Sequence, residues 1–307
     1  MLLPAVITDK DPGTGSPVWT SGCHPQATTI IISIMIADSR QDNTRRAFDD
    51  AATDFTALGR HLWDPIGAAT AAAAQLGPGD RVMDACCGAG ASAIPAAGLV
   101  GADGVVDAVD LSGPMVGELR RLSSDLPQLH ATQADVTTWD TAGYDAVLCA
   151  LGIFFFPDMT EGTRHLISRT RPGGRVVFTI WRGDAMAAAG RCLGHAVAAV
   201  TDAAPPQERE PHLFDRINKA DTYLAWLTEL GLTDVDVATH ELRLPLTPDL
   251  AWLVITGSGY RGALGNLEPD VVEDVRKRYL DSLHAEGITE FDGTTLIGIG
   301  LSPRHAR

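Results

Sequence analysis

The sequence predicts an α/β protein whose core is a mostly parallel sheet with helices on both faces. Two observations predict this class. Short apolar runs alternate with helix-length amphipathic segments from about residue 79 onward, which is the pattern of consecutive βαβ units. A glycine-rich turn also follows the first apolar run directly and opens a helix. Ligands of open parallel sheets bind at such turns, beyond the carboxyl ends of the strands.

Each predicted element follows from this alternation. The core strands are expected at residues 81–85, 105–110, 129–134, 145–151 and 175–180, with helices at 91–100, 115–124 and 160–170. Helices at 45–59 and 64–75 precede them, and Asp64-Pro65 is predicted as an N-cap followed by an N1 proline. Beyond the core we expect helices at 185–200, 221–230, 248–254 and 268–285, and strands at 235–244 and 294–301.

The first 40 residues are predicted to lie outside this fold, as a disordered or non-native extension. Residues 1–27 are rich in Gly, Pro, Thr and Ser without periodicity, which is typical of disorder. The apolar run at 28–36 is too short for a transmembrane helix. We favour Met35 as the natural start; the alternative is an added strand or a partner-binding arm.

Composition excludes several classes of partner. The 307 residues include 24 basic and 39 acidic side chains, for a net charge of −15. This balance opposes binding to nucleic acid and to anionic membranes, and it is compatible with a homo-oligomer. The five cysteines show no C-x-x-C spacing, which indicates a reducing, cytoplasmic setting without zinc or disulfides. No acidic cluster indicates a catalytic metal.

Three aspartates end three consecutive predicted strands. Gly88 and Gly90 in the turn after the first strand also fit a dinucleotide fingerprint, and Asp110, twenty residues later, can accept hydrogen bonds from ribose hydroxyls in either case. Asp84, however, would repel a pyrophosphate and favours a ligand with an ammonium group. Asp135, at the end of the third strand, can accept a hydrogen bond from an adenine amine. Together they favour one cationic, hydroxyl-bearing ligand over three unrelated turn residues.

These residues carry a resemblance to a known family. The motifs are Asp84-x-x-x-Gly88-x-Gly90, Asp110-Leu111-Ser112, Ala134-Asp135-Val136 and Arg171-Pro172-Gly173-Gly174. Over about residues 45–182 the chain resembles the class I S-adenosylmethionine-dependent methyltransferases. It is most similar to the branch of the ubiquinone and menaquinone methyltransferases and the small-molecule enzymes of actinobacterial secondary metabolism.

The resemblance implies a Rossmann-like, doubly wound, seven-stranded sheet whose last strand is antiparallel. It implies one methyltransferase domain over 41–307, made of a helical lid (41–78), a cofactor-binding core (79–182), substrate-side helices and insertions (183–290) and a terminal strand (291–307). S-adenosylmethionine is the implied cofactor and S-adenosylhomocysteine its product, with no metal. The implied cofactor-binding residues are Asp84, Ala85, Cys86, Gly88, Gly90, Asp110, Leu111, Met115, Asp135, Val136, Cys149 and Ala150. Phe48 and Phe55 stand where relatives often have a tyrosine that covers the cofactor.

The methyl acceptor is expected to bind after the fourth strand. Phe154, Phe155 and Phe156 follow that strand, and we expect these rings and Trp63 to wall an apolar acceptor pocket, although some may only pack the core. Candidate bases are His61, His212 and Tyr260.

The predicted function is methyl transfer to a carbon, nitrogen or oxygen of an apolar small molecule, in secondary metabolism or quinone-like biosynthesis. The reaction is a direct displacement in which alignment is the main catalytic effect. The alternatives are an NAD(P)-dependent oxidoreductase and a non-catalytic S-adenosylmethionine-binding module.

Overall fold

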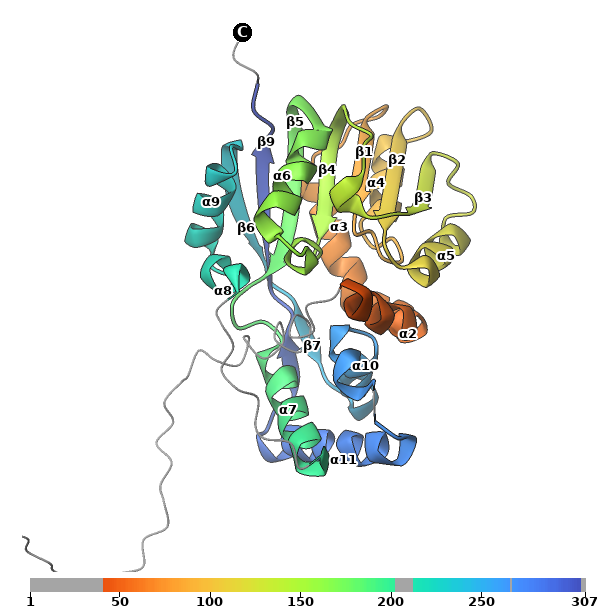
Figure 1. Cartoon of the computed structure of the whole chain (residues 1–307), viewed down its shortest axis with the longest axis vertical. Helices are drawn as coiled ribbons and strands as arrows, with labels where there is room; N and C mark the ends of the chain where they lie inside the picture. Colours follow the sequence, from red (N-terminus) through yellow and green to blue (C-terminus); the bar gives the residue numbers. More distant parts are fainter. Residues whose placement is uncertain (1–40, 202–211, 266, 305–307) are drawn as a thin grey trace, which may run out of the picture.

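A computed structural model of the chain describes residues 41–201, 212–265 and 267–304, so the expectations for residues 1–40 lie outside the described residues. Its centre is a seven-stranded sheet in the order β3-β2-β1-β4-β5-β9-β6 (Figure 1). The strands are β1 (Arg81–Ala85), β2 (Val105–Asp110), β3 (Leu129–Gln133), β4 (Tyr144–Ala150), β5 (Thr170–Trp181), β6 (Thr233–His240) and β9 (Thr295–Leu301). Only β9 runs antiparallel to its neighbours among these paired strands. The predicted fold class and antiparallel last strand are confirmed.

Helices cover both faces of this sheet, as the alternating pattern requires. One face packs against α3 (Trp63–Ala73) and α4 (Ala93–Val100) through small apolar side chains such as Ala71 and Ala97. The other face packs against α6 (Met159–Arg169) and α9 (Ala220–Glu229) through larger ones such as Leu166 and Tyr223. The helix α5 (Gly113–Leu122) follows β2 and contacts β3 and β2.

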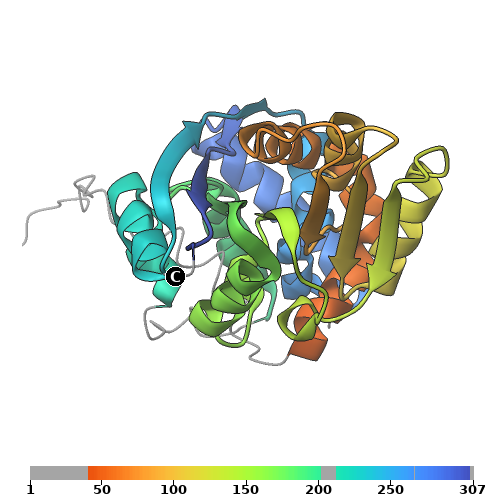
Figure 2. The ribbon, with the colours of Figure 1, turned by 90° about the horizontal axis from the view of Figure 1, so that it is seen from above.

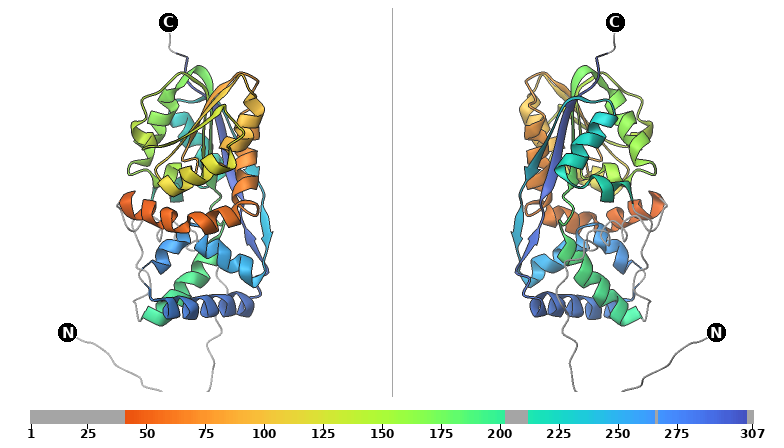
Figure 3. Two further views of the ribbon diagram at one scale, coloured as in Figure 1. Left: turned by 90° about the vertical axis from the view of Figure 1, so that its right-hand side faces the viewer. Right: turned by 90° about the vertical axis from the view of Figure 1, so that its left-hand side faces the viewer.

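A second group of elements lies beyond one end of the sheet. It comprises α7 (Ala187–Thr201), α10 (Pro248–Thr256), α11 (Pro269–Ala285), the short helix η3 (Gly259–Leu264), and a two-stranded sheet of β7 (Arg243–Pro245) and β8 (Glu290–Asp292). The helix α2 (Gln41–Gly59) lies between the main sheet and α7, α10 and α11, as both views of Figure 3 show. Figure 2 shows the sheet from the end that lies opposite to these elements. The short helix α8 (Leu213–Ile217) leads into α9.

Three local expectations are corrected by the structure. The predicted N-cap at Asp64 is wrong: α3 begins at Trp63 after Leu62, and Asp64 lies in its first turn. The single strand predicted at 235–244 is two strands, because the chain leaves β9 after β6 and β7 pairs with β8 instead. The fifth strand begins at Thr170 rather than at 175, with a bulge opposite Tyr144 and a left-handed Gly173.

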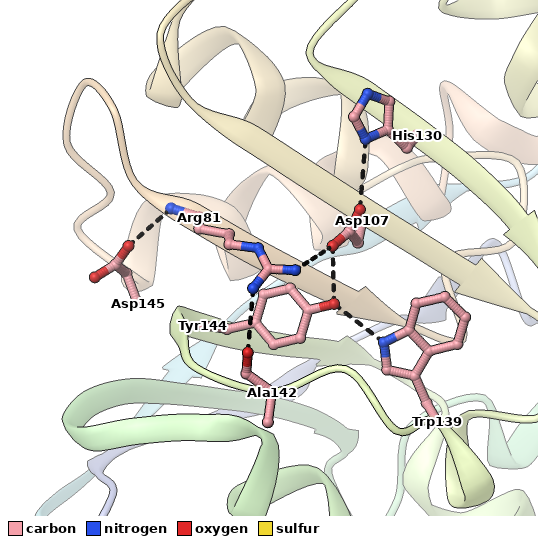
Figure 4. Close-up of polar contacts among 7 residues, drawn as sticks. All are labelled: Arg81, Asp107, His130, Trp139, Ala142, Tyr144 and Asp145. Atoms are coloured by element: carbon pink, nitrogen blue, oxygen red, sulfur yellow. Dashed lines mark hydrogen bonds and ion pairs between the residues drawn. The ribbon is translucent and has the colours of Figure 1, made fainter.

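A polar cluster ties β1, β2, β3 and β4 together away from the strand ends that carry the predicted motifs (Figure 4). The Asp107 carboxylate accepts hydrogen bonds from Arg81 at 3.3 Å and from the Tyr144 hydroxyl at 2.8 Å, and His130 lies 3.5 Å from it. Trp139 donates to the Tyr144 hydroxyl at 3.0 Å, and the Arg81 guanidinium lies 4.5 Å from the centre of the Tyr144 ring. Burial raises the pKa of Tyr144 to about 12, so this hydroxyl remains a donor to Asp107. The cluster is structural.

Candidate functional site

The glycine-rich turn after β1 and the Asp110 and Asp135 motifs meet at one cavity of about 200 Å³ at the carboxyl ends of the parallel strands. The Arg171–Gly174 motif lies at the beginning of β5 and does not line this cavity. One side is formed by the segments that follow β1, β2, β3 and β4, which include Gly88, Asp110, Asp135 and Ala150. The other side is formed by α2, the start of α3, and the segments around Met186 and η3. The parallel order of the strands brings these distant segments together.

Asp110 occupies the tip of β2 and is held by the backbone. One carboxylate oxygen accepts the backbone N–H of Gly88 at 2.9 Å, and the other accepts that of Ser112 at 2.8 Å. Burial raises the pKa of Asp110. The N–H donors lower this pKa, and the negative charge of Asp49 raises it. A carboxylate has about four lone-pair sites in all, and the backbone N–H groups of Gly88, Ser112 and Leu111 act on it. The carboxylate therefore retains acceptor capacity for a ligand hydroxyl.

Gly88 keeps the turn after β1 open toward the cavity. Its φ of +53° lies in the left-handed region, which glycine adopts without steric cost. A Cβ built on Gly88 would lie 3.5 Å from the ring of Phe55 on α2. Because 3.5 Å is ordinary van der Waals contact, the left-handed backbone, rather than a lack of space, is what favours glycine here.

Asp84 is completely buried beneath the same turn rather than on the cavity wall. Both of its carboxylate oxygens lie within hydrogen-bond distance of the Ser92 hydroxyl, at 3.0 and 2.8 Å. Burial raises the pKa of Asp84 to about 7, the Ser92 hydrogen bond lowers it, and the charge of Asp110 raises it further. Asp84 is thus a carboxyl group that titrates near neutrality, one residue layer behind the site.

Asp135 and Val136 lie at the start of the short helix η1 (Val136–Thr138) after β3. One Asp135 oxygen accepts hydrogen bonds from the backbone N–H and the hydroxyl of Thr137, at 2.9 and 2.7 Å. Both Asp135 and Val136 line the cavity, as does Leu111 after β2. This part of the wall therefore combines one carboxylate, that of Asp135, with the apolar side chains of Leu111 and Val136.

Two residues at the ends of β1 and β4 have strained backbones. Cys86 and Leu151 both line the cavity and have a φ of +56°, which is uncommon for side chains with a Cβ and concentrates at functional sites. Gly152 fits closely against the sulfurs of Cys86 and Cys149, since a Cβ there would come within 2.8 Å of both. A hydrogen bond with Cys149, together with burial, raises the pKa of the Cys86 thiol well above its ordinary value.

Aromatic rings dominate the remaining wall. The Phe55 and Trp63 rings stack with centroids 4.8 Å apart, and Phe48 meets Phe155 edge-on at 5.4 Å. Phe154, Phe156 and Trp181 also line the cavity. The prediction that Phe154, Phe155, Phe156 and Trp63 wall a pocket agrees with this placement; their contact with an acceptor remains a prediction.

The helix α2 is attached to both sides of the cavity that it covers. Near its middle, Asp49 accepts a hydrogen bond of 2.5 Å from the Ser112 hydroxyl at the N-cap of α5. Further along, Asp54 forms an ion pair of 3.4 Å with Arg261 of η3. Next to these two contacts α2 presents Phe48 and Phe55 to the cavity.

Of the three candidate bases, only Tyr260 lines the cavity. Its hydroxyl donates a 3.0 Å hydrogen bond to the backbone carbonyl of Met186, and burial raises its pKa well above the ordinary value. His212 caps α8, where its Nδ1 accepts the Phe214 N–H at 3.2 Å. His61 accepts a hydrogen bond from Arg60 at 3.0 Å. Neither histidine lies on the cavity wall.

The cofactor-binding residues predicted from the motifs divide in the same way. Those on the cavity wall are Cys86, Gly88, Asp110, Leu111, Met115, Asp135, Val136 and Ala150. Ala85, Gly90 and Cys149 are buried behind it with Asp84. The sequence reasoning missed Trp181, Met186 and Ser258, which lie outside the recognised motifs. The glycine-rich stretch at 257–262, most of which forms η3, was the one sequence signal that pointed to Ser258.

The fold and the site define an α/β protein whose cavity has strand-end aspartates on one side. On the other side are the rings of Phe48, Phe55, Trp63, Phe155 and Trp181, here called the aromatic chamber. Residues 82–174 match the family described as "Methyltransferase domain". Aklanonic acid methyltransferase DauC of a Streptomyces species is 27% identical over 145 residues, covering 46% of this chain and 66% of the relative. Nocamycin O-methyltransferase of Saccharothrix syringae is 27% identical over 139 residues, covering 43% and 49%. The chain thus spans about half to two thirds of these relatives.

A solved structure supports the same fold. The S-adenosylmethionine-dependent methyltransferase of Thiobacillus denitrificans, in complex with S-adenosylhomocysteine, aligns with a TM-score of 0.50 and 19% identity. The alignment covers 82% of this chain and 98% of that one. The family match over residues 82–174, the two named methyltransferases and this shared fold support a class I S-adenosylmethionine-dependent methyltransferase of actinobacterial type. No described helix is long and apolar enough to cross a membrane.

Proposed function

We propose that this chain transfers a methyl group from S-adenosylmethionine to an apolar small molecule. The observation that carries the proposal is a single cavity that joins two unlike walls. One contains Asp110 and Asp135 at strand ends, and the other contains the rings of Phe48, Phe55 and Phe155. A cofactor with a nucleoside fits the first wall and an apolar acceptor fits the second.

The residues of the first wall fit S-adenosylmethionine in chemistry. Asp110 would hold the ribose hydroxyls through the free acceptor capacity of its two oxygens, and Leu111 and Val136 would contact the adenine faces. The backbone around Gly88 would hold the methionine portion, with the Asp84 carboxyl behind it. When bound, the cofactor supplies a methyl group on a positively charged sulfur. The nearby carboxylates favour a cationic ligand.

The second wall would act by alignment and by exclusion of water. Methyl transfer is a direct displacement, so holding the two reactants in line supplies much of the rate. The raised pKa of the Cys86 thiol keeps this group neutral and therefore a weak nucleophile. This cavity cysteine consequently competes poorly with the acceptor for the methyl group. The hydroxyl of Tyr260, already bonded to Met186, acts as a structural donor rather than as a base.

The names of the relatives support an acceptor from secondary metabolism. Aklanonic acid methyltransferase and nocamycin O-methyltransferase both carry small-molecule acceptors in their names. The acceptor atom in this chain is proposed to be carbon, nitrogen or oxygen of such a molecule, in a cytoplasmic enzyme that requires no metal.

Calorimetry with three ligands tests the cofactor assignment. We expect S-adenosylhomocysteine to bind at micromolar concentration or below and NAD⁺ and NADP⁺ to show no saturable binding. A tritiated methyl-transfer assay with neutral aromatic phenols then tests turnover. Tight binding of a nicotinamide cofactor, with none of S-adenosylhomocysteine, would overturn the proposal. Binding without transfer to any acceptor would identify a non-catalytic S-adenosylmethionine-binding module instead.

A further inference from the structure

Met186 is a strained residue on the acceptor side of the cavity. It lies between β5 and α7, is 4% exposed, and has a φ of +58°. A residue other than glycine keeps a left-handed backbone only when its surroundings hold it there, and such residues cluster at ligand sites. Glycine would fit this backbone without strain. The presence of methionine instead of glycine therefore indicates that the methionine side chain has a role at this position.

The backbone of Met186 is fully engaged by its neighbours. Its N–H donates to the carbonyl oxygen of Asp292 on β8 at 2.7 Å. Its carbonyl oxygen accepts the Tyr260 hydroxyl at 3.0 Å and the Gly190 N–H of α7 at 3.3 Å. Because these bonds occupy the backbone groups, the part of Met186 left to meet a ligand is its side chain.

Tyr260 approaches from a different part of the chain. It belongs to η3, is 2% exposed, and follows Ser258, whose hydroxyl accepts the Tyr260 N–H at 3.3 Å and donates to the Val254 carbonyl at 2.6 Å. All the polar side-chain groups of Ser258 and Tyr260 thus have partners inside the protein. This region can discriminate between ligands by shape rather than by new hydrogen bonds.

We propose that Met186 is a specificity-determining residue whose thioether side chain sets the size of the planar, uncharged aromatic acceptor that the chamber admits, with Tyr260 as its positioning residue. The inference rests on the proposed function. The chamber beside Met186 includes the Phe155 and Trp181 rings, which favour stacking with aromatic ligands. Methionine is flexible and fills irregular apolar space, so its truncation enlarges the chamber without adding charge.

The test compares two neutral aromatic ligands of different size, 2-naphthol with two fused rings and 1-hydroxypyrene with four. Each is titrated against the full chain saturated with S-adenosylhomocysteine, by displacement of the apolar fluorophore N-phenyl-1-naphthylamine. The readout is the ratio of the two dissociation constants. Met186→Gly relieves the backbone strain and removes the side chain, so it should shift this ratio toward the larger ligand by about tenfold.

Two further variants separate specificity from stability. Met186→Leu keeps most of the volume and should leave the ratio within about twofold, while Tyr260→Phe keeps the ring, removes the hydroxyl and should shift the ratio about threefold toward the larger ligand. Affinity for S-adenosylhomocysteine should be the same in all four proteins, which a merely destabilised chain would not show. An unchanged ratio in Met186→Gly, or no displacement by either ligand in any variant, would overturn the inference. If the unmodified chain did not bind S-adenosylhomocysteine, the proposed function would be refuted instead.

Discussion

The buried carboxyl of Asp84 makes the stability of this protein dependent on pH, and Asp84→Asn is the substitution that reveals it. The ordinary pKa of 3.8 rises to about 7 in the folded chain, mainly through burial. Between these two values the unfolded chain has released its proton while the folded chain retains it. The stabilising contribution of this proton is therefore complete below about pH 4 and is lost as the pH rises toward 7.

The magnitude follows from the distance between the two pKa values. Each pKa unit corresponds to about 1.4 kcal/mol, so the stability of the wild type relative to Asp84→Asn should fall by about 3 kcal/mol between about pH 4.5 and pH 8. The asparagine is neutral throughout and can still accept the hydrogen bond from Ser92. Its presence removes the pH-dependent cost of a buried charge but leaves the packing in place.

Urea unfolding of both proteins at several pH values measures this difference directly. Ser92→Ala is a useful companion, because the Ser92 hydrogen bond lowers the pKa of Asp84. Without it the pKa of Asp84 should rise further, and the loss of stability should extend to higher pH. The reasoning would be refuted if the free energy of unfolding of the wild type, minus that of Asp84→Asn, stayed constant or rose with pH.

The remaining predictions concern ligand binding and packing. Asp110→Asn should weaken binding of S-adenosylhomocysteine by about 10- to 100-fold in calorimetry, while Asp107→Asn on the same strand, outside the cavity, should leave this affinity unchanged. If the ligand ammonium favours the ionised form of Asp84, the affinity for S-adenosylhomocysteine should increase by up to about tenfold per pH unit below about pH 7 and then level off. An affinity that does not change with pH would show that the ionisation of Asp84 does not affect binding. Gly67→Ala would place a Cβ 2.3 Å from the loop backbone after β1 and should destabilise the chain by about 3 kcal/mol in urea. Gly98→Ala in α4, where nothing lies within 4 Å, should stabilise it by about 0.5 kcal/mol.

The part of the site built on strand ends could be predicted because it depends on local patterns. Apolar runs identify the strands, and parallel order places all of their carboxyl ends at one edge. Asp110 and Asp135, which lie 25 positions apart in the sequence, therefore had to come close to each other. Their burial and hydrogen bonds follow from the tight turns in which they lie.

The proposed acceptor side could not be predicted in the same way because it depends on long-range contacts. The hydrogen bond from Tyr260 to Met186 joins residues 74 positions apart, and no periodicity relates β5 to η3. The left-handed backbones of Cys86, Leu151 and Met186 also leave no trace in residue type, since glycine or asparagine would be expected there. Such strain is visible only when the surrounding structure is known.

The two-point attachment of α2 has a consequence for turnover. Its contacts with Ser112 and Arg261 are a hydrogen bond to a carboxylate, worth about 2 kcal/mol, and a partly exposed ion pair, worth about 1 kcal/mol or less. Opening of this helix over a folded sheet would expose Phe48 and Phe55 and also Ala51 and Leu58, which are completely buried, so apolar packing is the main resistance to it. We expect product to escape through this opening, so that the lifetime of the closed helix, more than the speed of the displacement, sets the pace of the catalytic cycle.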